Sequence, residues 1–327
     1  MRVLVTGGAG YIGAHTSHLL ADRGDYVLVA DDLSSGSRAR VKGFPLLEVD
    51  LAEPASVAVV ADAIRTHRID SVIHFAARKQ VAESVERPAW YYQQNVGSIA
   101  NLILALEVEK TCSRLVFSST AAVYGDAGGV IDESRVPAPV NPYGASKLAG
   151  EQLVEATAAA WPLSAVSLRY FNVGGSARAE LADTGATNLI PIILNQLMTG
   201  QRPGIFGADY DTPDGSCIRD YVHVTDVAEA HLAVLDTLDG HVGHDVLNVG
   251  TGTGTSVAGM VLALMNESDI HVEPRILPRR PGDAAEVVAA VGRIESATGW
   301  QARFTLADIV SSAWESRRRA AAGAGTS

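Results

Sequence analysis

A tyrosine and a lysine four residues apart, Tyr143 and Lys147, have the types and spacing needed for acid–base chemistry. Pro142 suits the first turn of a helix, and an Ala-rich run continues to about Trp161, so both side chains are expected on one helix face. A free tyrosine has a pKa of about 10, and lowering it to about 7 requires roughly 4 kcal/mol of preference for the phenolate. An ammonium at about 4 Å supplies roughly that much at an effective dielectric of about 20. The pair predicts a lysine-tuned tyrosine acid/base, although the same spacing also occurs in surface helices without function.

A strand, a glycine-rich turn and a helix open the chain in an order typical of nucleotide binding. The strand Arg2–Thr6 is followed by glycines at G-x-G-x-x-G spacing, Gly8, Gly10 and Gly13, and Gly7 adds a G-x-x-G-x-x-G register. In this arrangement, backbone N–H groups at the start of a helix can bind a pyrophosphate. A glycine-rich turn without a ligand is the alternative, and the flanking strand and helix favour nucleotide binding over it.

Two acidic residues follow the second expected strand, at 26–30. Asp31 lies close to the twenty or so residues beyond the glycines at which a carboxylate binds the adenosine ribose. Its charge would repel a 2′-phosphate, and Asp32 adds a second negative charge. The pattern favours NAD over NADP as the cofactor, with a cap of a helix or turn as the alternative role for Asp31.

The composition indicates a compact globular enzyme and argues against several other classes. Of the 327 residues, 47% are hydrophobic and 19% charged, and the length suggests about two domains. The net charge of −11 argues against nucleic acid and against an anionic membrane surface as partners. Cys112 and Cys217 are too few for a disulfide framework, and no metal-ligand spacing appears, so no metal is expected. The chain opens on a strand, not a signal peptide, and has no apolar run approaching a membrane span, which predicts a cytoplasmic protein.

Strands and helices alternate over the first half of the chain. This repetition predicts a doubly wound α/β fold with a Rossmann parallel sheet and helices on both faces. From about residue 174 short elements and turns dominate, which predicts a smaller, interleaved α/β substrate-binding lobe. We expect a dinucleotide-binding domain at 1–173, joined by about 223–250, a substrate lobe at 174–222 and 251–319, and a disordered tail at 320–327.

Polar residues follow several strands of the expected sheet. Ligands of such sheets bind beyond the carboxyl ends of the strands. Thr120 follows the strand at 114–117, and the loops at Asp31, Asp50 and Ala77 belong to the same edge. Thr120 is the hydroxyl group expected to reach the substrate, whereas the two serines before it can simply cap the strand end.

Together these features resemble the extended type of the short-chain dehydrogenase/reductase superfamily, marked here by the glycine turn, Thr120 and the Tyr143/Lys147 pair. Further motifs, spread over both lobes and nearly the whole chain, resemble the UDP-glucose 4-epimerase (UDP-galactose 4-epimerase) family more closely. They are His-Phe-Ala-Ala at 74–77, Val-Tyr-Gly-Asp at 123–126, Asn-Pro-Tyr-Gly at 141–144, Leu-Arg-Tyr-Phe-Asn at 168–172, Arg-Asp-Tyr-Val-His-Val at 219–224 and Asn-Val-Gly at 248–250. Motifs in the right order over both lobes are more specific than any one of them.

The resemblance implies an isomerase that uses NAD without net oxidation. In that family a phenolate takes the proton from the 4-hydroxyl group of a UDP-hexose while hydride moves from C4 to the nicotinamide. The 4-keto sugar then rotates and takes the hydride back on its other face. By resemblance Tyr143 is the acid/base, Lys147 lowers its pKa and holds the nicotinamide ribose, and Thr120 hydrogen-bonds the 4-hydroxyl group.

The resemblance also assigns binding residues in both lobes. Besides Thr120, Tyr143 and Lys147, the positions that match cofactor contacts are Gly7, Gly10, Tyr11, Ile12, Gly13, Asp31, Asp32, Leu33, Ser34, Ser35, Gly36, Asp50, Leu51, Phe75, Ala76, Ala77, Arg78, Lys79, Asn95 and Phe171. Those that match UDP-sugar contacts, again with Thr120 and Tyr143, are Asn172, Asn188, Gly204, Ile205, Phe206, Arg219, Arg280, Asp283 and Val287. Arg219 and Arg280 are the cations that a diphosphate needs, and Phe206 can cover the uracil. An ordinary surface charge is the alternative for each arginine.

Three departures from the family pattern bear on the cofactor and the substrate. Asp32 stands where asparagine is frequent, which should hardly weaken NAD binding. Arg78 stands where an uncharged residue is common and could face an acidic sugar, so a UDP-uronate 4-epimerase, or another NAD-dependent nucleotide-sugar epimerase, remains an alternative. Val287 stands where some members have a bulky tyrosine that excludes an N-acetyl group on the sugar, so the N-acetylated hexose pair is a further expected substrate.

Other activities fit the residues less well. A 4,6-dehydratase needs an Asp-Glu pair after Thr120, where this chain has two alanines. A non-catalytic, NAD-sensing Rossmann protein has no need for Thr120, Tyr143 and Lys147 together, and a simple alcohol dehydrogenase would release NADH on every turnover. Two long Ala/Leu-rich helices at 88–109 and 143–161 are expected to pair into an intermolecular four-helix bundle, so the expected partners are a UDP-sugar and a second copy of the chain.

Overall fold

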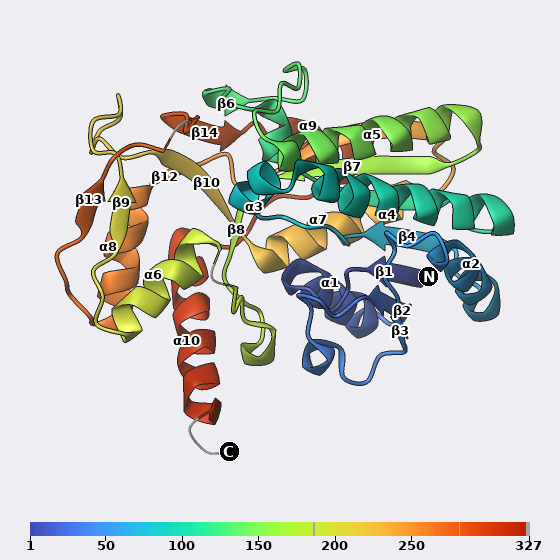
Figure 1. The fold of residues 1–327 in the computed structure, drawn as a ribbon, viewed down its shortest axis with the longest axis horizontal. Helices are drawn as coiled ribbons and strands as arrows, with labels where there is room; N and C mark the ends of the chain where they lie inside the picture. Colours follow the sequence, from blue (N-terminus) through green and yellow to red (C-terminus); the bar gives the residue numbers. More distant parts are fainter. Residues whose placement is uncertain (186, 281, 325–327) are drawn as a thin grey trace.

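A seven-stranded parallel sheet forms the centre of the larger lobe (Figure 1). The computed structural model of the chain describes residues 1–185, 187–280 and 282–324. The strands lie in the order β11-β7-β5-β4-β1-β2-β3, which reverses direction between β1 and β4. Their bounds are β1 Arg2–Thr6, β2 Tyr26–Asp31, β3 Leu46–Glu48, β4 Ser71–His74, β5 Arg114–Thr120, β7 Ser164–Tyr170 and β11 Gly243–Val249. The doubly wound fold predicted from the alternation of strands and helices is therefore confirmed.

Helices cover both faces of this sheet because successive strand residues point to opposite sides. Val3 and Val5 of β1 belong to a core with α1 and α7, whereas Leu4 between them belongs to a core with α2, α4 and α5. The bounds are α1 Tyr11–Asp22, α2 Ser56–His67, α3 Val81–Glu86, α4 Pro88–Glu109, α5 Pro142–Ala160, α7 Val224–Thr237 and α9 Gly292–Thr298, with 3₁₀ turns η1 Arg38–Val41 and η2 Ala121–Tyr124. Burial on both faces leaves the carboxyl ends of the strands as the edge at which polar groups can meet.

The smaller lobe contains two short sheets packed on three helices (Figure 1). One sheet has the order β12-β10-β14-β6, with β8 also paired to β10, and the other pairs β13 with β9. The bounds are β6 Gly129–Ile131, β8 Asn172–Gly174, η3 Ala179–Leu181, α6 Leu189–Met198, β9 Gly204–Phe206, β10 Ile218–His223, β12 Gly254–Ser256, α8 Val257–Ser268, β13 Arg275–Leu277, β14 Glu286–Ala289 and α10 Leu306–Ala324. Because β6 comes from the chain between β5 and α5, the two lobes are interleaved, as expected.

Two segments differ from the expected division of the chain. Helix α9 packs against α7 and β11 of the larger lobe, although it belongs to the range 251–319 expected for the smaller one. Helix α10 continues to Ala324, where a disordered tail was expected from residue 320, because alanine is the strongest helix former. Residues 325–327 of that expected tail lie outside the described residues. Among the described residues, no helix is long and apolar enough to cross a membrane.

Candidate active site

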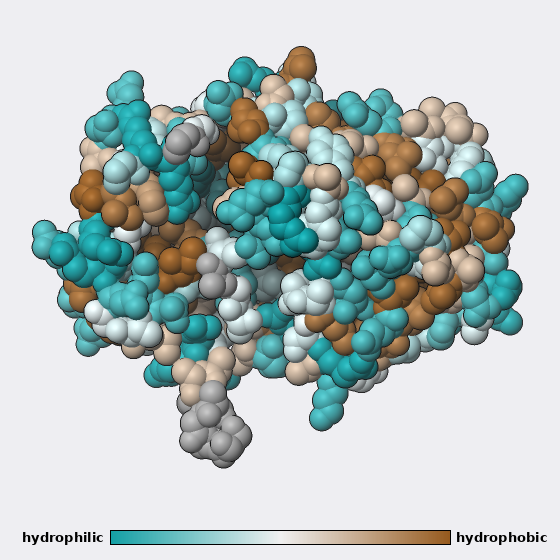
Figure 2. Space-filling model, in the orientation of Figure 1, coloured by the Kyte–Doolittle hydropathy of each residue, from teal (hydrophilic) through white to brown (hydrophobic). Residues whose placement is uncertain are grey.

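A cleft of about 920 Å³ lies between the two lobes, and the space-filling view shows the surface hollowed there (Figure 2). The carboxyl ends of the large sheet form one wall and the smaller lobe forms the other. The predicted site residues that line it are Gly7, Gly10, Tyr11, Ile12, Gly13, Asp31, Asp32, Ser35, Asp50, Leu51, Phe75, Ala76, Ala77, Arg78, Lys79, Thr120, Tyr143, Lys147, Phe171, Asn172, Asn188, Arg219, Arg280, Asp283 and Val287. Leu33, Ser34, Gly36, Asn95, Gly204, Ile205 and Phe206 are not in this lining, although most of them neighbour residues that are.

The glycine turn between β1 and α1 has no room for side chains at its tightest points. Gly7 has a φ of +67°, and a Cβ there would lie 2.6 Å from the backbone nitrogen of Ala76. A Cβ on Gly13 would lie 2.3 Å from the carbonyl oxygen of Gly7. Gly10 is the N-cap of α1 and offers no side chain to the first N–H groups of the helix. These N–H groups are suited to an anionic group such as a pyrophosphate.

Asp31 is held at the end of β2 beside this turn. One carboxylate oxygen accepts the N–H of Ala9 at 2.9 Å, and the other accepts the N–H of Leu33 at 2.8 Å. Burial raises the pKa of Asp31, and these hydrogen bonds offset part of that rise. A Cβ on Gly36 would lie 2.7 Å from the same carboxylate, so the loop after β2 wraps closely around it. The fixed carboxylate can accept further hydrogen bonds from hydroxyl groups in the cleft.

Tyr143 lies in the first turn of α5 and is 9% exposed. The N-cap side chain of Asn141 accepts the N–H of Gly144 at 2.9 Å, which fixes where the helix starts and so where the phenol lies. Thr120, the last residue of β5, lies beside the phenol, and its hydroxyl group accepts the N–H of Ala122 at 3.2 Å. Burial raises the pKa of Tyr143, and the neighbouring Thr120 hydroxyl group offsets only part of this effect.

Lys147 is buried on the same face of α5, as the four-residue spacing predicts. Its ammonium donates a hydrogen bond to the Ser118 carbonyl at 2.7 Å and lies 4.8 Å from the centroid of the Phe117 ring. Burial lowers the pKa of Lys147 to about 7, although the carboxylate of Glu151 raises it in part. Burial of the phenol dominates in this structure and holds the pKa of Tyr143 above its usual value, so the lowering by Lys147 that the sequence suggests stays a prediction.

A buried ion pair behind Lys147 was missed by the sequence analysis. Arg169 of β7 donates through Nε to Glu151 of α5 at 2.9 Å, and its Nη2 bonds the second carboxylate oxygen. Ser119 of β5 donates to the same carboxylate, and neither charged side chain is more than 5% exposed. The network ties α5 to the ends of β5 and β7 and therefore fixes the position of Lys147 relative to Thr120. The one signal in the sequence is that Glu151 lies four residues beyond Lys147, on the same helix face.

Arg219 is anchored in β10 on the wall formed by the smaller lobe. Its Nη1 donates to the carbonyl oxygens of Ile218 at 2.8 Å and Ala284 at 2.9 Å. Its Nη2 lies 3.4 Å from a carboxylate oxygen of Asp283. Val287 of β14 is its direct partner in the β10–β14 ladder. Arg219, expected near the diphosphate, and Val287, expected near the sugar, are thus neighbours. In the sequence they are 68 positions apart, from 219 to 287.

Two other residues of the expected substrate set are also in contact. The guanidinium of Arg280 lies 3.8 Å over the centroid of the Phe206 ring. Phe206 ends β9, which extends from Gly204 and contains Ile205. Asn188 donates to Asp183 at 2.6 Å at the start of α6. Arg280 and Asn188 line the cleft, and Phe206 lies behind Arg280, outside the lining.

The side chain of Arg78 contacts residues of the larger lobe and not the expected substrate-binding lobe. Its guanidinium lies 2.7 Å from a carboxylate oxygen of Asp32 and donates to Gln94 at 3.1 Å. Asp32 follows β2, on the side of the sheet where the adenosine end of a dinucleotide binds. These contacts do not support the expectation that Arg78 faces an acidic sugar.

Further residues line the cleft that the sequence did not single out. They include Arg40, Gln80, Val81, Val85, Gln94, Ser98, Gly125, Val140, Tyr170, Val173, Asp183, Thr184, Gly185, Thr187, Leu189, Ile190 and Tyr221. Tyr170 could have been found, because it ends β7 at the edge where strands meet ligands. Arg40 carried no such signal, since it comes from a short 3₁₀ turn and bonds the Ala182 carbonyl from a distance of 142 residues along the chain.

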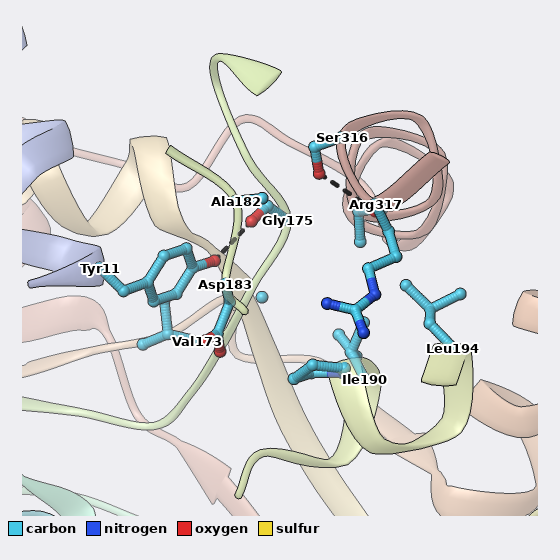
Figure 3. Close-up of a pocket in the computed structure, with 12 residues that line it drawn as sticks. Tyr11, Val173, Gly175, Ala182, Asp183, Ile190, Leu194, Ser316 and Arg317 are labelled. Carbon is cyan, nitrogen blue, oxygen red and sulfur yellow. Dashed lines mark hydrogen bonds between the residues drawn. The ribbon is translucent and has the colours of Figure 1, made fainter. Parts of the chain in front are cut away.

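A small second cavity of about 20 Å³ lies between α1 and the smaller lobe (Figure 3). The Tyr11 hydroxyl group donates to the Gly175 carbonyl at its edge, and Asp183, Ile190 and Arg317 also line it. This volume has room for about one water molecule and not for a nucleotide. Through its hydrogen bond to Gly175, Tyr11 at the start of α1 links the glycine turn to the smaller lobe.

The fold and the cleft define a protein of the short-chain dehydrogenase/reductase type, with a dinucleotide-binding sheet and a Tyr-x-x-x-Lys helix beside a threonine. The chain belongs to the NAD dependent epimerase/dehydratase family, whose family model matches residues 3–250. It is 44% identical over 324 residues to the UDP-glucose 4-epimerase of Azospirillum brasilense, with 96% of this chain and 92% of that relative covered.

Solved structures agree with this placement. The UDP-glucose-4-epimerase from Stenotrophomonas maltophila with bound NAD and formylated UDP-arabinopyranose matches with a TM-score of 0.92 at 35% identity, covering 99% of each chain. The UDP-Glc/GlcNAc 4-epimerase from Campylobacter jejuni matches with a TM-score of 0.85 at 35% identity, covering 97% of this chain and 99% of that one. The resemblance to UDP-glucose 4-epimerases, inferred from the motifs, is confirmed.

Proposed function

We propose that the protein is an NAD-dependent 4-epimerase that interconverts UDP-glucose and UDP-galactose through a transient 4-keto sugar. The observation that carries the proposal is that one cleft joins the glycine turn, the Tyr143/Lys147 pair and Arg219 of the smaller lobe. An oxidoreductase site beside a cationic substrate wall is what a nucleotide-sugar epimerase needs. The similarity to named UDP-glucose 4-epimerases over nearly the whole chain supports the same activity.

NAD fits the residues on the larger-lobe side of the cleft. It would supply a group that accepts hydride from C4 of the sugar and returns it, so that the net reaction is an isomerisation. The first N–H groups of α1 would bind its pyrophosphate, and Asp31 would bind the adenosine ribose. Asp50 and Leu51 would lie near the adenine, and Lys147 near the nicotinamide ribose.

Tyr143 takes the proton of the sugar 4-hydroxyl group and later gives it back. Because burial raises the pKa of Tyr143, its phenolate needs stabilisation inside the cleft. The ammonium form of Lys147, on the same face of α5, favours the phenolate electrostatically. Thr120 lies beside the phenol in the same cleft and would orient the same hydroxyl group of the sugar.

The smaller lobe holds the UDP part of the substrate. Arg219 and Arg280 neutralise the diphosphate, and Phe206 covers the uracil with Arg280 packed over its ring. Asn172 and Asn188 supply amide groups. The fixed Arg219, held by two carbonyl oxygens, binds without the entropic cost of ordering a free arginine. We assign the cofactor to the range 1–173 with 223–250, and the substrate mainly to 174–222 and 251–319.

Incubation of the purified protein with UDP-galactose tests this function. We expect UDP-glucose to form without added NAD, and NAD to appear when the protein is denatured. Accumulation of NADH with loss of substrate would indicate a dehydrogenase, and no 4-epimer product would contradict the proposal. UDP-galacturonate is tested in parallel for the uronate 4-epimerase alternative. That alternative has less support in the structure, because Arg78 pairs with Asp32.

The N-acetylated hexoses are a second substrate pair. Val287 is a small side chain next to Arg219 on the substrate wall, and it leaves room for an acetamido group. The structural relative from Campylobacter jejuni, a UDP-Glc/GlcNAc 4-epimerase, indicates that this fold can act on both pairs.

The chain forms a homodimer in the cytoplasm under this proposal. α4 and α5 pack side by side, and Leu104 and Val108 of α4 are exposed apolar side chains available to a second copy. A four-helix bundle between two copies would cover them. Cys112 and Cys217 are both free and buried.

A further inference from the structure

Arg78 connects three elements around the cofactor side of the cleft. Starting from the loop after β4, its Nη2 reaches Asp32 at 2.7 Å and its Nε donates to Gln94 of α4 at 3.1 Å. Its remaining amino group donates to the Ser34 hydroxyl group. The Arg78 backbone is fixed as well, because Asn95 accepts its N–H at 2.7 Å and donates to its carbonyl at 3.0 Å.

This connection crosses the carboxyl end of β1. In the sheet β1 lies between β4 and β2, Arg78 follows β4, and both Asp32 and Ser34 follow β2. A side chain that joins these two loops must pass the end of β1, where the glycine turn begins at Gly7. In sheets of this kind a dinucleotide passes the same point, with its pyrophosphate on the glycine turn. Arg78 and Asp32 both line the cleft there.

We propose that Arg78, Asp32 and Ser34 form a strap across the cofactor groove that holds bound NAD and slows its release. The strap rests on the proposed function, because NAD is the cofactor of that reaction. An epimerase returns its hydride to the same sugar, so it does not have to exchange its cofactor between turnovers. A groove closed over the cofactor is compatible with that reaction and would hinder a dehydrogenase that releases NADH.

The carboxylate of Asp32 is placed to stay ionised within the strap. The side chains of Arg78 and Asp32 are 20% and 26% exposed, so the pair is partly shielded from water. Burial opposes ionisation of Asp32, but hydrogen bonds from Ser34 and the charge of Arg78 together lower its pKa below the usual value. Asp31 is bonded by two backbone N–H groups instead, which leaves it available to the ribose.

Release of NAD from Arg78→Leu tests the strap. The protein purified with its bound NAD is moved into NAD-free buffer, and NAD in the filtrate is measured over time. We expect release about tenfold faster than from the wild type, because a charged pair with supporting hydrogen bonds is lost. Asp32→Asn should also speed release, and the double variant should be no faster than Arg78→Leu alone if the two residues act as a unit.

Arg87→Leu is the matched control. Arg87 lies 3.8 Å from the Trp90 ring, which Arg78 also approaches at 5.4 Å, but its charge pairs with Glu83 on the exposed side of the helices. We expect the wild-type release rate from this variant. Unchanged release from both Arg78→Leu and Asp32→Asn would overturn the strap and leave the proposed function standing.

A wild-type protein that binds no NAD would overturn the cofactor of the proposed function, and the strap with it. If Arg78→Leu does not fold, Arg78→Lys and Asp32→Asn complete the test. Lysine keeps the charge but loses the planar fork that joins Asp32, Ser34 and Gln94, so its release rate should lie between those of the wild type and Asp32→Asn. Release from both at the wild-type rate would again overturn the strap.

Discussion

Burial sets the charges of the two reactive groups on α5. It disfavours both the phenolate of Tyr143 and the ammonium of Lys147, whose pKa falls to about 7. The proposed chemistry therefore needs a phenolate that burial in this structure disfavours, and the ammonium form of Lys147, on the same face of α5, is the group that we propose to stabilise it.

Tyr143→Phe removes the proton carrier while keeping the ring that packs in the cleft. We expect turnover of UDP-galactose to fall by about 10²–10⁴-fold, which is the usual contribution of a general acid/base, with UDP binding nearly unchanged. Initial rates and equilibrium binding of UDP measure the two effects. Tyr26→Phe, at the opposite end of the sheet, should retain full turnover. Near-normal turnover by Tyr143→Phe would remove the central catalytic assignment.

Lys147 should make the folded protein more stable as the pH rises. Its pKa is about 7 in the folded state and about 10.4 when unfolded, so between these values the unfolded chain binds one more proton than the folded one. The free energy of unfolding therefore gains up to about 1.4 kcal/mol per pH unit from this group across that window. Lys147→Met removes the gain. Urea unfolding of both proteins is measured at pH 7, 8 and 9, with equal NAD content. The free energy of unfolding of the wild type should rise with pH relative to that of the variant. A constant difference between the two proteins would contradict the lowered pKa of Lys147.

Val287→Tyr should narrow the range of sugars. A tyrosine next to Arg219 would fill the space left for an acetamido group, so turnover of UDP-N-acetylgalactosamine should be lost while UDP-galactose is still converted. The ratio of the kcat/KM values for UDP-galactose and UDP-N-acetylgalactosamine, compared between wild type and variant, measures this change in specificity. In the wild type, a preference above about a thousandfold for UDP-galactose, or roughly 4 kcal/mol, would already exclude the N-acetylated pair.

The placement of Thr120, Tyr143 and Lys147 at one cleft could be predicted from their types and spacing, but their contacts could not. The four-residue interval put Tyr143 and Lys147 on one helix face, and Thr120 was found as the residue after a strand. The bond from Lys147 to the Ser118 carbonyl depends on where α5 packs on β5, which no local pattern encodes. The contact between Arg78 and Asp32 spans 46 positions and needed the order of the sheet.

At the scale of elements, α5 is held by a charge pair that lies inside the protein. Glu151 and Arg169 join α5 to β7, and Ser119 adds β5 to the same contact. A buried pair of this kind costs desolvation energy on formation, but loss of one partner leaves the other charge uncompensated. The pair therefore acts mainly by fixing the position of the reactive helix.

Glu151→Gln should destabilise the protein by about 3 kcal/mol, because Arg169 would be left buried without a counter-charge. It should also lower the pKa of Lys147 further, since the carboxylate of Glu151 raises that pKa. Chemical unfolding measures the first effect and the pH profile of turnover the second. Glu155→Gln, an exposed site one turn further along α5, is the control and should behave like the wild type. Equal stability of the two variants would show that the pair does not hold α5.

Element prediction succeeded where a periodic pattern or a terminal residue marked the segment. Pro88 opens α4 and Pro142 opens α5 at the expected positions. Short strands such as β6 and β14 have three and four residues, too few to display a period. They form only because β14 pairs with β6 on one side and with β10 on the other. The position of Val287 beside Arg219 is a product of that pairing.

At the scale of the whole molecule, the site is made by two interleaved lobes. β6 packs in the smaller lobe, although the chain on either side of it belongs to the larger lobe. α9 packs on the larger lobe, although the chain on either side of it belongs to the smaller one. Neither lobe is therefore assembled from one continuous stretch of chain. The protein has a net charge of −11, so the arginines of the smaller lobe form a local positive region in a negatively charged molecule. Under the proposed function these few cations bind the anionic substrate, which favours specific binding over general attraction to polyanions.

The exposed face of α4 should be the centre of a dimer. Leu104 and Val108 are 47% and 64% exposed, lie one turn apart on α4, and belong to a helix that packs along α5. A glutamate at Leu104 would be buried against a second copy without a partner, which costs several kcal/mol and should shift the protein to a monomer. Light scattering of the wild type and Leu104→Glu at micromolar concentration measures the change. Leu262→Glu on α8 introduces the same charge at an exposed leucine of the smaller lobe and should leave the dimer intact. A wild type that is monomeric at this concentration would rule out the four-helix bundle, and a Leu104→Glu variant that remains dimeric would place the interface elsewhere.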